Sequence, residues 1–126
     1  MKKPQTKASK PKFKSKFEQK FWERTKLPYE QEKLAYVVPA SNHKYTPDFH
    51  IFGTNIYLET KGRWTVVDRK KHLLIKQQHP DKRIILVFQN PKMPISRGSK
   101  TTYAGWAEKN GLEWMTLDEA VNMSAK

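Results

Sequence analysis

A carboxylate and a lysine stand two positions apart in the stretch NIYLETKG (residues 55–62), namely Glu59 and Lys61. A second carboxylate, Asp48, lies in the stretch TPDF (residues 46–49). Both stretches have strand-like composition, and side chains two apart on a strand share a face. Pairing of the two strands across the turn between them would bring Asp48 close to the pair. Two carboxylates repel a phosphate unless a divalent cation lies between them. We therefore expect metal-assisted phosphodiester hydrolysis, with the lysine orienting water or stabilising the transition state.

The available donor atoms limit the choice of metal. The ligands would all be oxygens, and the chain has no cysteine, which favours Mg²⁺ or Mn²⁺ over Zn²⁺. An acid-x-lysine triplet alone also fits a surface ion pair between Glu59 and Lys61 on a solvated strand. Two features favour the active site instead: the strand context and the basic charge of the chain.

The charge of the chain points to nucleic acid. Among 126 residues, 25 Lys and Arg stand against 12 Asp and Glu, for a formal net charge of +13. A small domain this basic is expected to meet an anion, and nucleic acid is the leading partner. An acidic membrane is the alternative, but no stretch approaches the roughly 20 apolar residues of a membrane span. The lack of cysteine fits a reducing, intracellular setting.

The chain divides into two parts by composition. Residues 1–14 are rich in lysine, contain two prolines and have no acid, which is typical of a disordered basic arm. This arm could bind the phosphate backbone, or it could be only a solubilising tail. Residues 15–126 are expected to form a single domain, because they are enough for one core.

Patterning predicts the elements of that domain. Ser15 and Glu18 match a capping box at the start of the first helix, and Thr116 and Glu119 match another. The expected order is helix, three strands, helix, strand, helix, a short strand and a helix, over residues 15–26, 34–38, 45–51, 56–61, 66–79, 83–88, 101–111, 112–115 and 116–123. A meander followed by a crossover helix and a buried strand predicts a mixed α/β sheet with helices on its faces.

Some of these expectations concern the core. In the helix over residues 66–79 we expect the apolar side chains to point inward, and we assign two tryptophans to the core. The inward residues are Val66, Val67, Leu73 and Leu74, and the tryptophans are Trp64 and Trp106.

A proline-aspartate pair followed by glutamate-x-lysine resembles the restriction-endonuclease-like nuclease superfamily. More narrowly, YVVPASNHKYTPDF, LETKG and DRKKHLLIKQQHP, in this order, resemble the phage endonuclease I family of Holliday-junction resolvases. The similarity runs over about residues 15–88, with weaker similarity in GSKTTYAGWAEKNGLEW. The resemblance implies an αβββαβ nuclease core.

The resemblance also implies roles for single residues. The family's metal-binding acids fall on Asp48 and Glu59, and its lysine falls on Lys61. The helical glutamate falls on Glu18, where it would help to hold a second metal, and the peptide carbonyl of Thr60 is the expected backbone ligand. One or two Mg²⁺ or Mn²⁺ ions would occupy each site.

Family members are intertwined homodimers, so the resemblance implies a domain-swapped dimer here. The inter-subunit bridge would correspond to residues 38–42. Glu18 would then serve a site whose Asp48, Glu59 and Lys61 come from the other chain. Two sites related by a two-fold axis suit a substrate in which two strands are cut.

The expected activity is a metal-dependent, structure-selective endodeoxyribonuclease that resolves four-way junctions and branched DNA by paired phosphodiester hydrolysis. It would act in the cytoplasm of an infected bacterial host. A non-catalytic nucleic-acid-binding protein on a nuclease-like fold is the alternative, and a ribosomal-type RNA-binding protein is a third. Asp48, Glu59 and Lys61 have no purpose in either alternative.

Basic residues around the expected site are candidates for phosphate contacts, although each could instead lie on a solvated surface. These candidates are Lys12, Lys14, Arg63, Arg69, Lys70, Lys71 and Lys76. His43 and His72 could bind DNA or could have a structural role.

Overall fold

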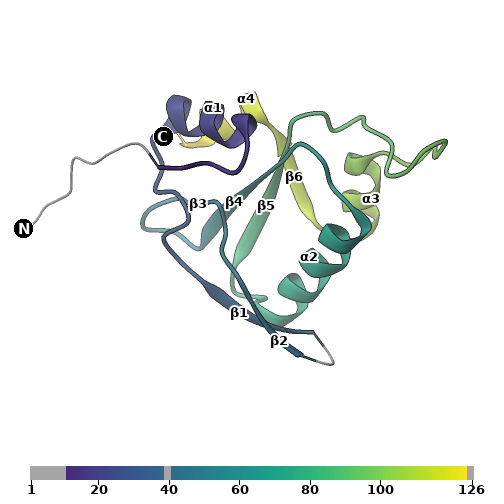
Figure 1. Cartoon of the computed structure of the whole chain (residues 1–126), viewed down its shortest axis with the longest axis horizontal. Coiled ribbons are helices and arrows are strands. Elements are labelled where there is room, and N and C mark those ends of the chain that lie inside the picture. Colours follow the sequence, from purple (N-terminus) through teal and green to yellow (C-terminus); the bar gives the residue numbers. More distant parts are fainter. Residues whose placement is uncertain (1–10, 39–40, 125–126) are drawn as a thin grey trace, which may run out of the picture.

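The computed structural model describes residues 11–38 and 41–124. Figure 1 shows the elements in chain order. They are α1 (Lys16–Thr25), β1 (Leu34–Val38), β2 (Ser41–Tyr45), β3 (Phe49–His50), β4 (Ile56–Lys61), α2 (Val66–Gln78), β5 (Arg83–Phe88), α3 (Tyr103–Lys109), β6 (Glu113–Thr116) and α4 (Leu117–Ser124).

The central sheet is mixed, as the sequence predicts. Its strand order is β3-β4-β5-β6. β3 pairs antiparallel with β4, whereas the β4–β5 and β5–β6 pairs are parallel. Helices α1 and α4 cover one face, and α2 lies with α3 on the other side of the sheet (Figure 1). The carboxyl ends of β4 and β5 therefore lie between the helices of the two faces.

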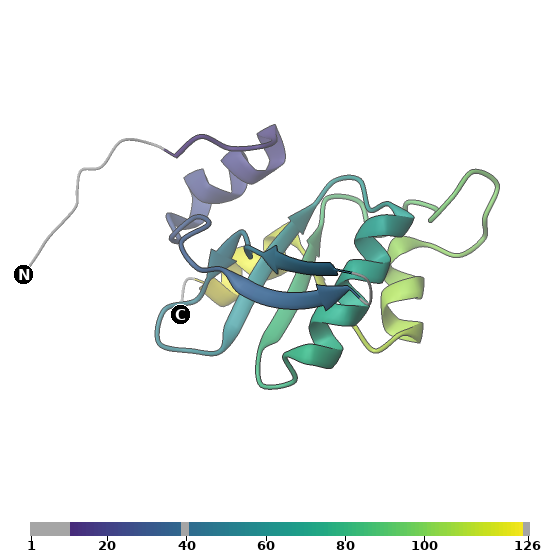
Figure 2. The same cartoon turned by 60° about the horizontal axis from the view of Figure 1, so that its bottom comes forward.

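Strands β1 and β2 form a separate antiparallel hairpin, in which Leu34 pairs with Tyr45 and Val38 with Ser41. Figure 2 shows this hairpin in front of the central sheet. Residues 39–40, in the expected inter-subunit bridge, lie outside the described residues. Within the chain the two strands pair with each other, and the swapped dimer stays a prediction.

The prediction of a single strand over residues 45–51 is wrong. The structure divides it: β2 ends at Tyr45 and β3 begins at Phe49. Pro47 lies in the break, where it has no N–H to donate to a strand ladder. Asp48 therefore directly precedes a strand rather than lying inside one.

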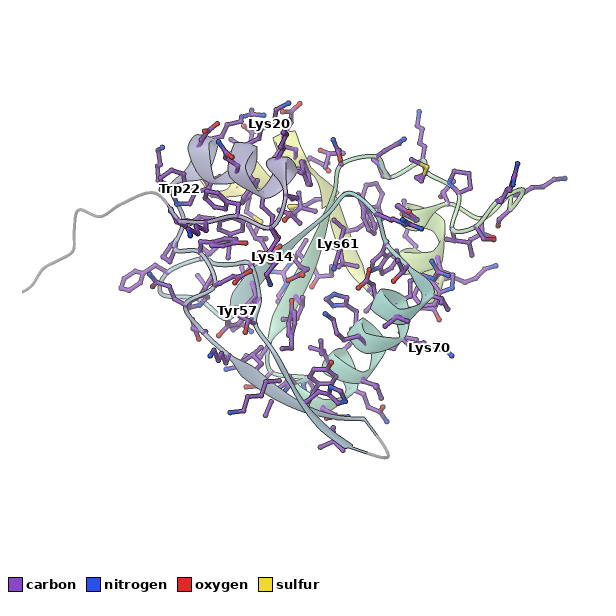
Figure 3. All side chains as sticks on the ribbon, viewed as in Figure 1. Lys14, Lys20, Trp22, Tyr57, Lys61 and Lys70 are labelled. Atoms are coloured by element: carbon purple, nitrogen blue, oxygen red, sulfur yellow. The ribbon has the colours of Figure 1, made fainter. Side chains whose placement is uncertain are left out.

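The end of the predicted arm is packed onto the domain. The ring of Phe13 lies 5.6 Å from that of Trp22 and 4.6 Å from that of Tyr29, centroid to centroid. Figure 3 shows Lys14, the next residue, in the middle of the view beside Lys61, with which it lines one cavity, whereas Lys20 and Lys70 lie at the periphery. Residues 11–14 thus belong to the folded part, and residues 1–10 of the expected arm lie outside the described residues.

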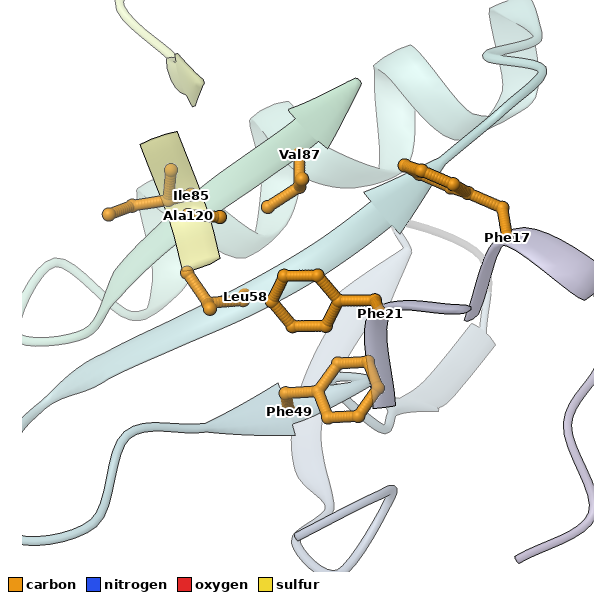
Figure 4. Close-up of a cluster of buried hydrophobic side chains, with 7 residues drawn as sticks. All are labelled: Phe17, Phe21, Phe49, Leu58, Ile85, Val87 and Ala120. Atoms are coloured by element: carbon orange, nitrogen blue, oxygen red, sulfur yellow. The ribbon is translucent and has the colours of Figure 1, made fainter. Parts of the chain in front are cut away.

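The core below α1 and α4 is a cluster of aromatic and aliphatic side chains (Figure 4). Phe21 and Leu58 are fully buried in it, and Ala120 of α4 closes its far side. Truncating a side chain this deeply buried typically destabilises a protein by about 2–5 kcal/mol. This packing fixes α1, and with it Glu18, against the sheet.

On the other face, the inward residues of α2 differ from the expectation. Val66 and Val67 are 53% and 71% exposed, so the expectation that they point inward is wrong. The buried residues are instead Arg69, His72 and Ile75, which recur every three positions as one helix face does. Leu73 and Leu74 pack against the core as expected, as do Trp64 and Trp106.

Candidate active site

Three carboxylates meet at the edge of the sheet: Glu18 from α1, Glu30 from the α1–β1 connector and Asp48 before β3. One oxygen from each lies within 4.8 Å of the others. Glu18 and Asp48 are buried, and Glu30 is half-buried. This cluster is called the acidic triad below. Three oxygen donors at this spacing fit a hard divalent cation.

Asp48 is held by β4, the strand that pairs with β3. Its Oδ2 accepts hydrogen bonds from the backbone N–H of Thr60 (3.0 Å) and from Thr60 Oγ1 (2.8 Å). Burial, together with the charges of Glu59 and Glu18, nevertheless raises the pKa of Asp48 to about 9. A carboxyl group that is so hard to ionise lacks a compensating positive charge, which a bound metal would supply.

Glu18 is positioned by its neighbours rather than by a full capping box. Ser15 Oγ accepts from the backbone N–H of Glu18, as expected at an N-cap. The Glu18 carboxylate does not return this bond: it accepts from the backbone N–H of Lys14 (2.9 Å) and from the Tyr29 hydroxyl (2.5 Å). The capping-box prediction is thus half right: Ser15 caps the helix, but the Glu18 carboxylate does not bond back to Ser15. It lies instead beside Glu30 and Asp48, the other two acids of the triad.

Glu30 is a site residue that the sequence analysis missed. Its backbone adopts a left-handed conformation with φ of 49°, which is uncommon for a residue with a side chain. Its N–H donates to the carbonyl of Asp48 (2.8 Å), and its carboxylate pairs with Lys14 Nζ (2.9 Å). The one local signal was an acidic YEQE stretch in a basic chain. Nothing in its periodicity marks Glu30 for the site.

Glu59 and Lys61 lie next to the triad and contact each other. Glu59 accepts from the Tyr45 hydroxyl (2.7 Å) and from the backbone N–H of Asp48 (3.2 Å). Lys61 Nζ lies 3.6 Å from Glu59 and 3.6 Å from Asp68. Lys61 is only 14% exposed, so these two acids hold its ammonium at the site.

Burial shifts the pKa values of Glu59 and of its partner Tyr45. It raises the pKa of Glu59, with Lys61 opposing the shift. Burial and the charge of Glu59 also raise the pKa of Tyr45, so its hydroxyl remains a donor. The structure thus brings Asp48, Glu59 and Lys61 together, as expected from strand pairing. Glu59 is not a member of the acidic triad.

Two open cavities meet at this point. One, of about 270 Å³, lies over the acids and Lys71. The other, of about 400 Å³, runs past Lys16 and Arg63 to Gln89. Glu18, Thr60 and Lys61 line both cavities. A polymer that followed the two cavities would pass directly over the site.

Comparison with known proteins gives this arrangement a family. The Phage endonuclease I family matches residues 3–121. The chain belongs to this family.

Two relatives within the family are close in sequence. Endonuclease I of Escherichia phage T7 is 48% identical over 89 residues, which cover 71% of this chain and 59% of the relative. Endodeoxyribonuclease 1 of Enterobacteria phage T3 is 48% identical over 87 residues, which cover 69% of this chain and 57% of the relative. The chain thus matches less than two thirds of the length of either.

For this endonuclease I family member, one expected phosphate contact needs correction. Arg69 is buried, and its Nη1 donates to the backbone carbonyls of Trp64 (2.9 Å) and Ile95 (3.4 Å). The residue stabilises a loop, and we leave it out of the proposed DNA contacts. Sequence pattern could not separate it from its basic neighbours, because only the direction of α2 decides which cation points inward.

The other basic candidates stay near the surface. Lys71 Nζ lies 5.4 Å from the centre of the Tyr45 ring, at the mouth of the site. Lys14 is engaged with Glu30, as described above. Lys14 is exposed, and so are the remaining candidates Lys12, Arg63, Lys70 and Lys76.

The two candidate histidines also differ in environment. His72 is 2% exposed, and neither ring nitrogen has a hydrogen-bond partner among the described residues. Burial lowers the pKa of His72 to about 3, so the ring is neutral and structural. The ring of His43 stacks on that of Tyr36, with 5.6 Å between the ring centroids.

Among the described residues, no helix has both the length and the apolar content to cross a membrane.

Proposed function

We propose that this chain is a metal-dependent, structure-selective endodeoxyribonuclease that resolves four-way junctions and other branched DNA by paired phosphodiester hydrolysis. The observation that carries the proposal is the acidic triad beside a held lysine, in a member of the phage endonuclease I family. The net charge of +13 fits a polyanionic substrate. The protein would act in the cytoplasm of the infected host.

Mg²⁺ or Mn²⁺ is the cofactor that fits the site best. Glu18, Glu30 and Asp48 would hold it with carboxylate oxygens, which these cations prefer. Glu59 and the Thr60 carbonyl are further candidate ligands, for one or two ions. When bound, the metal polarises the scissile phosphate and makes a bound water more acidic.

The chain's own residues prepare the site for this chemistry. Glu59 and Asp68 hold the Lys61 ammonium, where it can orient the attacking water or stabilise the charge that develops on the phosphate. Thr60 fixes Asp48 through two hydrogen bonds, and Tyr45 fixes Glu59 through one. Because these contacts exist before substrate binds, little reorganisation is needed during the reaction.

Selectivity would rest on the shape of branched DNA rather than on base sequence. The cavities that meet at the site are lined by cations along the path a backbone would follow, including Lys16, Arg63 and Lys71. Phosphate contacts of this kind position DNA without reading its bases. A homodimer with exchanged N-terminal parts would present two such sites to one junction, so that two strands could be nicked.

The test is cleavage of an end-labelled four-way junction and of its linear duplex arms, each with Mg²⁺ and with EDTA. We expect paired, Mg²⁺-dependent nicks near the junction centre, with the duplex mostly spared. Asp48→Asn should abolish cleavage while keeping junction binding, because a metal ligand is lost and a negative charge is removed.

Asp118→Asn is the matched control, since it removes the same charge at an exposed position, and it should cut like the parent chain. Cleavage that survives Asp48→Asn would contradict the proposed site. Tight binding without cleavage by the unmodified chain, in Mg²⁺ or Mn²⁺, would favour the non-catalytic binding protein.

A further inference from the structure

A basic loop connects β5 to α3. It comprises residues 90–102 and is called the basic loop below. It contains Lys92, Arg97 and Lys100 and no aspartate or glutamate. All three cations are exposed. None of them forms an ion pair with a residue in the part of the chain that the structure describes.

The loop has a defined backbone. The N–H of Ile95 donates to the carbonyl of Thr101 (2.9 Å), and that of Tyr103 donates to the carbonyl of Met93 (2.8 Å). Its tip turns at Gly98, where φ is 77°, a conformation that favours glycine. At its base, the buried Arg69 donates to the carbonyl of Ile95 (3.4 Å). A loop that was only a spacer would not need this support from a buried arginine.

The loop begins at the active site. β4 and β5 are parallel, with Lys61 opposite Phe88, so the loop leaves the same edge of the sheet as the catalytic lysine. The first residue after β5, Gln89, donates its N–H to the carbonyl of Lys61 (2.9 Å) and lines the cavity of about 400 Å³. From there the loop projects past α3 and away from the body of the molecule in both views (Figures 1 and 2).

A DNA strand in that cavity would run from the scissile phosphate toward this loop. Cations placed there without acidic partners attract phosphates through long-range charge and can contact the backbone. We propose that the basic loop binds the phosphates of one duplex arm next to the scissile bond, with Arg97 and Lys100 as its main contacts. This inference rests on the proposed function, and it adds a DNA contact outside the catalytic residues.

The experiment measures binding at several salt concentrations in an Asp48→Asn background, so that the DNA stays uncut. The test variant adds Arg97→Gln and Lys100→Gln. The control adds Lys20→Gln and Lys109→Gln, which remove equal charge from exposed positions outside the two cavities. One four-way junction has arms of roughly two helical turns, and a second has arms of roughly half a turn.

For the test variant on the long-armed junction, the slope of log affinity against log salt should become shallower by about two units, since each lost phosphate contact removes about 0.9. The control should keep the slope of its parent. On the short-armed junction, the test variant should bind as its parent does.

A test variant with the slope of the control on long arms would overturn the inference. Equal losses on long and short arms would overturn it too, because the cations would then act at the junction centre. If the Asp48→Asn parent binds no junction at all, the proposed function fails together with the inference. A parent that binds normally confines any failure to the basic loop.

Discussion

At the residue scale, the site is built around an aspartate that the metal-free protein has difficulty ionising. Burial and neighbouring acids raise the pKa of Asp48 from 3.8 to about 9. Between these values the folded chain keeps a proton that the unfolded chain releases. The free energy of unfolding of the metal-free protein therefore falls as the pH rises through this window. The raised pKa of Glu59 acts in the same direction.

We expect the melting temperature of the EDTA-treated protein to fall as the pH is raised from about 5 to about 8. Asp48→Asn should flatten this dependence, and added Mg²⁺ at the upper pH should stabilise the parent chain more than the variant. Differential scanning fluorimetry across the pH range measures both effects. Glu113→Gln is the control, because its partner Arg83 lowers the pKa of that acid. If the melting temperature depends on pH equally in the parent and in Asp48→Asn, the Asp48 carboxyl group is not the cause of that dependence.

Local pattern identified some site residues and could not identify others. Asp48, Glu59 and Lys61 were predictable because strand alternation and one hairpin are enough to bring them together. Glu30 was not predictable. Its own backbone is left-handed, and it lies in a connector that is joined to β3 by the Tyr29–Phe49 β-bridge. Such placement depends on tertiary contacts that no sequence period records.

At the element scale, the N-terminus of α2 connects helix stability to the active site. Thr65 caps the helix in a full capping box with Asp68, and Asp68 also holds Lys61. Thr116 and Glu119 form an equivalent box at the start of α4, with no contact to Lys61 in the described residues. The two boxes form a matched pair for separating stability from function.

Thr65→Ala and Thr116→Ala should each lower the free energy of unfolding by about 1 kcal/mol, as expected for a lost N-cap. Only Thr65→Ala should also slow junction cleavage, because it frees the side chain of Asp68 and with it the ammonium of Lys61. Urea denaturation and single-turnover cleavage of a junction measure the two quantities. Equal cleavage rates for the two variants would mean that the α2 cap does not position the lysine.

The elements themselves were largely predictable. Runs of apolar residues and N-cap residues located four helices and the strands β1, β4, β5 and β6, whereas β2 was not predicted as a strand. The break at Pro47 was missed because the apolar pattern continues through it. The inward face of α2 was missed because His72 and Arg69 are buried, whereas Val66 and Val67 are not. Hydrophobicity alone does not predict an arginine that satisfies backbone carbonyls in the interior.

At the scale of the whole molecule, the question is which chain supplies α1 to each site. In the described chain, Glu18 lies beside Asp48 of the same chain, and the β1–β2 hairpin connects their two regions. Straightening of this hairpin would carry α1 and the connector with Glu30 to a partner, where the same contacts could form between chains. Domain exchange of this kind reuses existing contacts and changes little except the hinge.

Complementation between two inactive variants tests the exchange. We expect Glu18→Gln and Asp48→Asn each to be inactive alone. In a swapped heterodimer of the two, one site carries both substitutions and the other carries neither. Co-expressed variants should therefore regain Mg²⁺-dependent nicking of one junction strand, measured as single nicks rather than paired cuts. If each chain completes its own site, every site keeps one substitution, so co-expressed variants that associate and stay inactive would rule out the exchange.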